Sequence, residues 1–122
     1  MYVLTAAGTF SAGEGLAFLL QERHRAEVVG ETTAGAANPG QLYPVNDRFS
    51  VTVPNGRLKS TIGGGNWEGV GVTPDVKTPA AEALPVAYSR ALRTLIDREP
   101  AGPWRDTLDR TLRNIETHSP NR

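Results

Sequence analysis

The chain passes from strand to helix within Gly8-Thr9-Phe10-Ser11-Ala12-Gly13-Glu14, which follows the apolar run Tyr2-Val3-Leu4. Residues 12–24 carry leucines at the spacing of a helix packed on a sheet, and residues 26–31 have the composition of a strand. A strand, a helix and a strand in this order predict a βαβ unit with parallel strands and a right-handed crossover. Ser11 is then expected at the carboxyl end of the first strand, at the edge where open α/β sheets usually build their sites.

Ser11 has two interpretations at this position. Ser11 and Glu14 have the spacing of a capping box, in which the serine side chain accepts a backbone N–H and the glutamate reaches back. A serine at a helix start also lies among unpaired N–H groups and the positive end of the helix dipole, which stabilise developing negative charge. The local sequence favours capping, and the nucleophile interpretation depends on the rest of the chain.

The middle of the chain is rich in turns. We expect residues 32–40, which contain mainly Thr, Ala, Gly and Asn, to form a loop on the same edge of the sheet as Ser11. Alternating apolar residues predict a β-hairpin over residues 48–61, with its turn at residues 54–57. The glycine run at residues 63–65 lacks the lysine and helix start of a phosphate loop and is interpreted as a hinge.

The C-terminal part is expected to be helical. One helix is predicted from Pro79, with Pro85 starting or kinking it, and another around residues 104–115. The polar residues from Thr117 onward are predicted to fray.

Composition argues against several classes of protein. The chain has 122 residues, with 13 Lys and Arg balancing 13 Asp and Glu, so no net charge draws it to nucleic acid. It has no cysteine and two histidines far apart in the sequence, so we expect no disulfide, no metal site and no cofactor. No segment predicts a membrane span, and no secretory signal is recognisable.

Several motifs occur in a fixed order along residues 2–88. After the serine come Gly30-Glu31-Thr32-Thr33-Ala34-Gly35, Asn38-Pro39-Gly40 and Asn66-Trp67-Glu68-Gly69-Val70-Gly71-Val72-Thr73-Pro74-Asp75. This ordered set resembles the C-terminal processing, or tail-specific, serine peptidases, and within them the branch of the tricorn core protease and interphotoreceptor retinoid-binding protein. The resemblance implies a crotonase-like α/β fold, incomplete in this chain, and a peptidase that acts on polypeptides.

The resemblance also implies roles for individual residues. Ser11 corresponds to the nucleophile, and Glu68 corresponds to the carboxylate that steers the catalytic histidine. The backbone N–H of Ala12 is expected to be one oxyanion donor, by analogy with other strand-to-helix serines. The branch of the family that uses a lysine base has that lysine where this chain has Ala36, so the histidine branch fits better.

The general base is the missing part. His24 lies at the far end of the helix that begins near Ser11, about 20 Å away at 1.5 Å per residue, and His118 lies in the predicted tail. In the tricorn-like branch the histidine comes from an upstream segment. We therefore expect the isolated chain to be inactive unless an upstream segment or another subunit supplies the base, and we expect that copies of the chain can assemble.

Two further expectations follow from the resemblance. Residues 1–99 would be the C-terminal part of the catalytic domain, and residues 100–122 a helical extension with a frayed tail. A parent protein of this family can be exported or periplasmic, which this chain does not reveal. The alternative function is a non-catalytic binding module for apolar ligands, because the retinoid-binding repeats resemble this fold.

Overall fold

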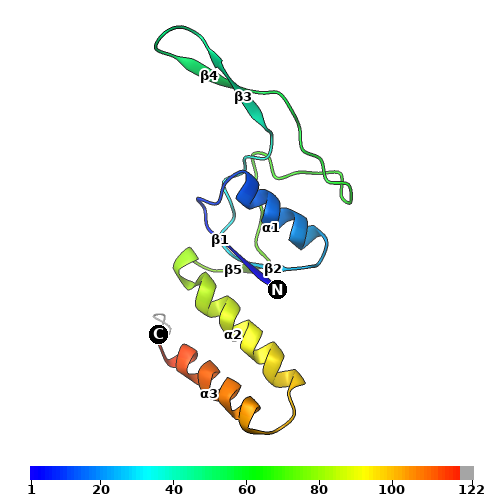
Figure 1. Ribbon diagram of the computed structural model, residues 1–122, viewed down its shortest axis with the longest axis vertical. Coiled ribbons are helices and arrows are strands. Elements are labelled where there is room, and N and C mark those ends of the chain that lie inside the picture. The colour runs from blue at the N-terminus through cyan, green and yellow to red at the C-terminus, as the bar shows by residue number, and fades with distance from the viewer. Residues whose placement is uncertain (119–122) are drawn as a thin grey trace.

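A computed structural model describes residues 1–118 of the chain. The elements, in chain order, are β1 (Tyr2–Thr5), α1 (Ala12–Glu22), β2 (Glu27–Gly30), β3 (Gly40–Pro44), β4 (Ser50–Pro54), β5 (Val76–Lys77), α2 (Ala80–Arg98) and α3 (Pro103–His118). The molecule is elongated: the β3–β4 hairpin projects from one end, α2 and α3 form the other, and β1, β2, β5 and α1 lie between them (Figure 1).

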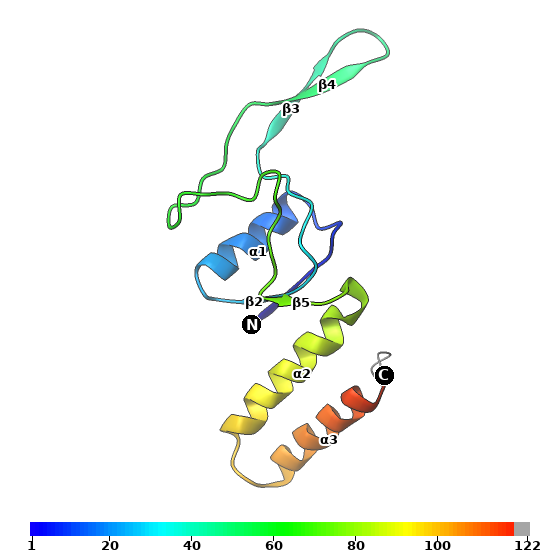
Figure 2. The same ribbon diagram turned by 180° about the vertical axis from the view of Figure 1, so that it is seen from behind.

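The central sheet confirms the predicted βαβ unit. Its strand order is β1-β2-β5, and β2 is parallel to both neighbours. In the β1–β2 pair Val3 lies opposite Val28. Helix α1 covers one face of this sheet and α2 the other, as the views from front and back agree (Figures 1 and 2).

Two adjacent residues of β2 explain why both faces are covered. Val28 and Val29 are each fully buried, and side chains of successive strand residues point to opposite faces. Val28 belongs to the cluster on the α1 side with Ala17 and Trp67, whereas Val29 packs against α2. Because side chains of β2 alternate between the two faces of the sheet, the core around this strand consists of two small clusters, one on each face.

Helix α1 ends two residues earlier than the predicted range of 12–24. His24 adopts a positive φ of 52°, and the N–H of Arg25 donates to the carbonyl of Leu20 at 2.8 Å. A residue in this left-handed conformation followed by a backward hydrogen bond is a common way for a helix to stop. This turn changes the direction of the chain between α1 and β2.

The predicted hairpin position is wrong. Residues 40–44 pair with residues 50–54, so the turn lies at residues 45–49 and not at residues 54–57. The side chain of Asn46 accepts the N–H groups of Arg48 and Phe49, at 2.9 and 3.0 Å, which closes the turn locally.

The C-terminal helices agree with the sequence in kind and differ in detail. Helix α2 begins before Pro85, which lies inside it, so this proline does not start the helix. Helix α3 continues through Thr117 to His118, so the predicted fraying does not begin at Thr117, and residues 119–122 lie outside the described part. Within residues 1–118 no helix combines the length and the apolar character that crossing a bilayer requires.

Candidate active site

The Ser11 turn has an unusual backbone. Ser11 is the N-cap of α1 with φ 51° and ψ −115°, a region that residues other than glycine rarely occupy. The turn before it is closed by two contacts, from the N–H of Thr9 to the carbonyl of Ala6 and from the N–H of Ala6 to the hydroxyl of Thr9. Such strain persists only where the surroundings hold it, and it is common at functional sites.

Only the glutamate half of the predicted capping box is a full hydrogen bond. The N–H of Ser11 donates to the carboxylate of Glu14 at 2.8 Å. The Ser11 hydroxyl lies in the capping-box arrangement but makes no cap hydrogen bond of ordinary geometry. The helix start is therefore held more firmly by the Glu14 carboxylate than by the Ser11 hydroxyl.

Glu14 is fully buried and binds much more than the helix start. One carboxylate oxygen accepts the hydroxyl of Thr33 at 2.5 Å and the N–H of Gly35 at 2.6 Å. The other accepts the N–H of Ser11 at 2.8 Å and that of Ala36 at 2.9 Å. The carboxylate thus joins the Ser11 turn to the loop that follows β2.

These contacts set the pKa of Glu14. Burial raises the pKa of this carboxyl, whereas hydrogen bonds from the Thr33 hydroxyl and from the N–H groups of Ala36, Gly35 and Ser11 lower it. The net result is a pKa below the ordinary value, so Glu14 is a buried anion at neutral pH.

Glu68 holds the next two residues of the same loop. Its Oε2 atom accepts the N–H of Ala37 at 2.7 Å and the N–H of Asn38 at 2.8 Å. Its Oε1 atom has no hydrogen bond within residues 1–118. The N–H groups of residues 35–38 are therefore bound in consecutive pairs, the first by Glu14 and the second by Glu68.

A hollow of about 220 Å³ opens beside the nucleophile candidate. It is lined by Ser11, Ala12, Gly15, Ala37, Pro39, Leu58 and Trp67. Trp67 is a core residue, 5% exposed, and its ring centroid lies 4.9 Å from that of Phe18, as core packing predicts. Glu68 does not line this hollow, but its carboxylate accepts a hydrogen bond from the N–H of Ala37, which does line it.

Backbone donors at the helix start are only partly used. The N–H of Ser11 is bound by Glu14 and so is not free to hold an oxyanion. Ala12 is one of the residues that line the hollow, and its N–H makes no hydrogen bond within the described chain. The structure thus leaves available the donor that the sequence analysis selected.

No residue lining the hollow is a base. Of the seven lining residues none is a histidine, lysine or arginine. His24 follows the opposite end of α1 from Ser11, as the sequence analysis expected, and the side chain of His118 lies outside the described part. Within residues 1–118 the hollow therefore has Ser11 and Ala12 on its lining and no histidine or lysine.

Comparison with known proteins identifies the family. The sequence profile of peptidase family S41 matches residues 1–78, and the chain belongs to this family. A solved structure of the photosystem II D1 C-terminal processing protease is 33% identical, with a TM-score of 0.54 over 65% of this chain. Mature CPAF is 24% identical, with a TM-score of 0.48 over 67% of this chain. The chain spans 20% and 16% of the lengths of these two proteins.

The role of Glu14 beyond capping was missed from the sequence. The signal was present, because Glu14 precedes Ala17 and Phe18 by three and four residues and so lies on the helix face that packs on the sheet. An acid on an apolar helix face has to be paired with donors. Its partners Thr33, Gly35 and Ala36 could not be identified, because they come from a loop without regular spacing.

Proposed function

We propose that this chain is part of a serine-type peptidase in which Ser11 is the nucleophile. Membership of family S41 supports the class of reaction, and the backbone of Ser11 is the observation that carries the assignment. A strained serine between a strand and a helix, beside a hollow, is the arrangement that acyl transfer needs. The substrate would be a polypeptide.

The other groups take complementary roles in this proposal. The N–H of Ala12 is one oxyanion donor, because it is free and borders the hollow. Glu68 steers the base: its Oε2 atom is committed to the loop, while its Oε1 atom is left to accept a hydrogen bond from an imidazole. The base itself comes from an upstream segment or from another subunit, and the isolated chain is inactive.

The extent of the catalytic domain is part of the same proposal. Residues 1–99 form its C-terminal part, with the crotonase-like fold of the tricorn-like branch, and residues 100–122 form an extension. Helix α3 packs on α2 through Leu92, Ile96 and Leu108 and is remote from the hollow, which supports this division.

The hollows beside Ser11 give little support to a carrier of apolar ligands. The hollow beside Ser11 measures about 220 Å³, and the neighbouring apolar hollow at Phe18 and Leu58 about 100 Å³. Pockets that enclose drug-sized ligands usually measure roughly 300–1,000 Å³. Neither of these two hollows reaches this size. An apolar hollow of about 310 Å³ does, but it lies between β1 and α2 and is not lined by Ser11; its lining residues are Tyr2, Leu4, Leu84, Ala87, Tyr88 and Ala91.

The test is peptide hydrolysis by the complete gene product that contains this chain. We expect hydrolysis that is abolished by Ser11→Ala, and a loss of about 100-fold or more with Glu68→Gln. Gln can keep the two loop hydrogen bonds through its amide oxygen, so this variant removes the charge without releasing the loop. Activity that is unchanged by Ser11→Ala would refute the assignment, and saturable binding of a fatty acid without hydrolysis would favour the carrier.

A further inference from the structure

We infer that Glu14 is a positioning residue, whose ionised carboxylate fixes the Ser11 turn against residues 33–36 and thereby sets the geometry of the hollow. This inference rests on the proposed function for its catalytic consequence, while its structural part stands by itself. Ser11 and Ala37, on the two sides of the hollow, come from segments that the carboxylate connects.

Every hydrogen bond that Glu14 makes through its carboxylate is one in which the carboxylate accepts. Four donors converge on its two oxygens, two on each: the Thr33 hydroxyl and the Gly35 N–H on Oε1, and the Ser11 and Ala36 N–H groups on Oε2. An ionised carboxylate accepts at both oxygens and donates at neither. It is the side chain that satisfies this set of donors.

An amide of the same shape fails at this position. Gln has one accepting oxygen and one NH₂ group, so in either orientation the NH₂ group would face at least one backbone N–H donor. In one orientation it opposes the N–H of Gly35, while the Thr33 hydroxyl can turn to accept from it, and in the other it opposes the N–H groups of Ser11 and Ala36. Buried donors left without an acceptor are costly, so the loop would separate from the helix start.

The same helix carries a matched control. Glu22, near the end of α1, accepts the Ser60 hydroxyl and the Gly63 N–H on Oε1, while its Oε2 atom is buried without a partner in the described part. Gln at position 22 can keep the accepting oxygen on Ser60 and Gly63. Glu22→Gln therefore removes a charge from the same helix without opposing any donor.

The inference also bears on the strain at Ser11. The positive φ of Ser11 is held on its N–H side by the hydrogen bond to Glu14, and on its carbonyl side by the N–H of Gly15 at 3.0 Å. Without the first of these bonds the residue is free to relax to an ordinary helix-start conformation. The hydroxyl would then leave the position beside Ala12, and the Ala12 N–H would no longer be next to the reacting atom.

The first experiment uses the chain as described. Amide hydrogen exchange is measured for Ser11, Gly35 and Ala36 in wild type, Glu14→Gln, Glu14→Asp and Glu22→Gln. Exchange at these residues is expected to accelerate about 100-fold in Glu14→Gln, less in Glu14→Asp, and not in Glu22→Gln. Asp is shorter than Glu but accepts at both oxygens, whereas Gln has the length of Glu but accepts at only one. If the number of acceptors matters more than side-chain length, protection should decrease from wild type to Glu14→Asp to Glu14→Gln. Equal protection in wild type and Glu14→Gln, or better protection with Gln than with Asp, would overturn the inference.

A measurement on the wild type covers the case in which Glu14→Gln does not fold. The amide proton shifts of Ser11, Gly35 and Ala36 and the carboxyl carbon of Glu14 are followed by NMR as the pH is lowered. A common titration midpoint is expected for all four signals, and separate midpoints would contradict the inference.

The second experiment measures hydrolysis by the complete gene product. Glu14→Gln is expected to lower kcat about 100-fold with little change in KM, because misplacement by about 1 Å can have this effect, and Glu14→Asp is expected to recover part of it. An unchanged kcat in Glu14→Gln would overturn the positioning role. Absence of activity in the wild type would refute the proposed function, and the exchange data would still decide the role of Glu14 in the loop.

Discussion

The loop at residues 33–38 and the β3–β4 hairpin are neighbours in sequence and opposite in construction. The loop has no regular structure, yet two carboxylates bind four of its consecutive N–H groups, and Thr33 and Ala37 are buried. The hairpin is regular, yet every one of its strand residues is exposed. Regular hydrogen bonding and rigid placement are therefore separate properties in this molecule.

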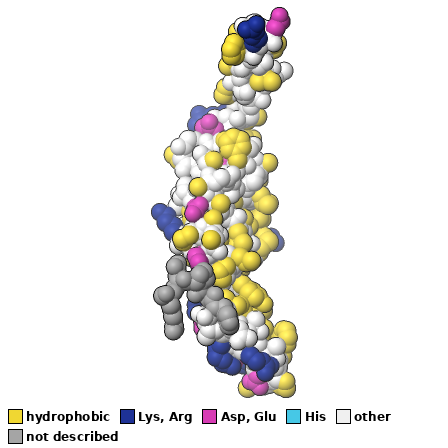
Figure 3. All heavy atoms as spheres, turned by 90° about the vertical axis from the view of Figure 1, so that its left-hand side faces the viewer, with side chains coloured by type: hydrophobic (Ala, Val, Ile, Leu, Met, Phe, Trp, Pro, Cys, Tyr) yellow, Lys and Arg dark blue, Asp and Glu magenta, His cyan; other side chains and the backbone are white. Residues whose placement is uncertain are grey.

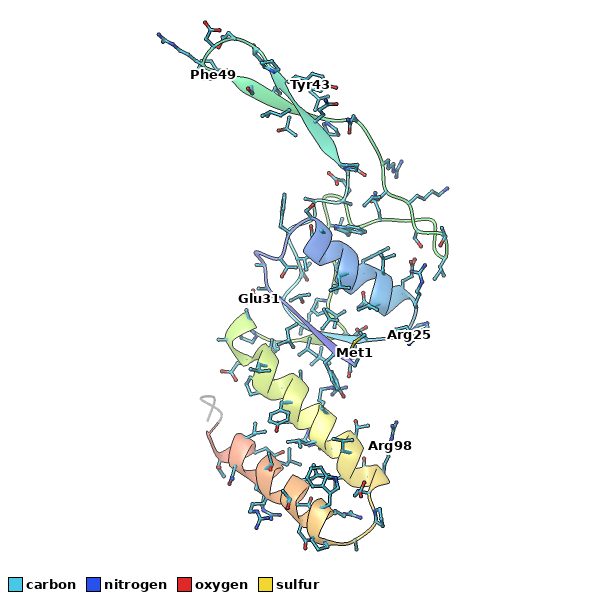
Figure 4. All side chains as sticks on the ribbon, viewed as in Figure 1. Met1, Arg25, Glu31, Tyr43, Phe49 and Arg98 are labelled. Carbon is cyan, nitrogen blue, oxygen red and sulfur yellow. The ribbon has the colours of Figure 1, made fainter. Side chains whose placement is uncertain are left out.

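The side chains of the hairpin make the contrast clear. Tyr43 and Phe49 lie on the projecting hairpin, away from the central sheet (Figure 4), and are 44% and 67% exposed. Hydrophobic side chains are visible on the hairpin surface as well as along the body (Figure 3). A two-stranded hairpin without a packed face is at best marginally stable in water. The loop is held by hydrogen bonds to side chains of the rest of the fold, whereas the hairpin is held mainly by the hydrogen bonds between its two strands.

The largest effect is expected where backbone segments meet beneath the loop. A Cβ at Gly71 would lie 2.1 Å from the carbonyl oxygen of Thr33, and φ there is +74°. Gly71→Ala should therefore destabilise the chain by about 3 kcal/mol or more, measured by urea unfolding. Gly65→Ala is the control, since nothing lies within 4 Å of its added Cβ. A loss below about 1 kcal/mol in Gly71→Ala would mean that the loop is free to move.

A smaller effect is expected from the Thr33 hydroxyl. This hydroxyl donates to Glu14 and accepts the N–H of Val72 at 2.7 Å, inside the protein. Thr33→Val leaves the Val72 N–H without an acceptor and should cost about 2 kcal/mol, whereas Thr33→Ser keeps both bonds and should cost about half as much. Equal thermal stability of the Val and Ser variants would show that these hydrogen bonds do not hold the loop.

The stability of the loop should depend on pH in one direction. Because the pKa of Glu14 is lower in the folded chain than in the unfolded chain, its contribution is fully present above the unfolded pKa. The contribution is lost as the pH falls through the folded pKa. Urea midpoints measured from neutral to acidic pH should fall in the wild type and fall less steeply in Glu14→Gln. Parallel curves for the two proteins would contradict the lowered pKa.

The smallest effect is expected on the hairpin. Val51 is 46% exposed and has Tyr43 as its cross-strand neighbour. Val51→Thr keeps the β-branched shape and should change the free energy of unfolding by less than about 0.5 kcal/mol. A loss comparable to that of Thr33→Val would show that the hairpin packs against something in solution, and would erase the difference between the two regions.

Much of the fold could be predicted from local sequence patterns, whereas less of the candidate site could be predicted in this way. The βαβ unit was predictable because the periodicity of residues 2–31 changes from strand to helix and back within one short unit. The hairpin was misplaced because the Pro-Asn-Gly sequence at residues 54–56 is a strong turn signal, while the true turn depends on the side chain of Asn46. Local propensity could not rank two competing turns.

The candidate site shows the same limit. Ser11 and Glu68 were selected through a resemblance to a family and Ala12 by analogy with other serines at a strand-to-helix junction, and their catalytic roles remain predictions. The connection between Glu68 and the Ser11 hollow passes through the N–H of Ala37, a long-range contact that no spacing in the sequence encodes. Glu14 was interpreted only as a cap, because three of its four partners lie about twenty residues away on a loop.

The most direct test of the account is covalent labelling of the complete gene product with a fluorophosphonate, followed by peptide mass spectrometry. The account predicts one adduct, on Ser11, which disappears in Ser11→Ala and is formed much more slowly in Glu14→Gln than in Glu22→Gln. Labelling of another serine, or peptide hydrolysis that persists without Ser11, would contradict it.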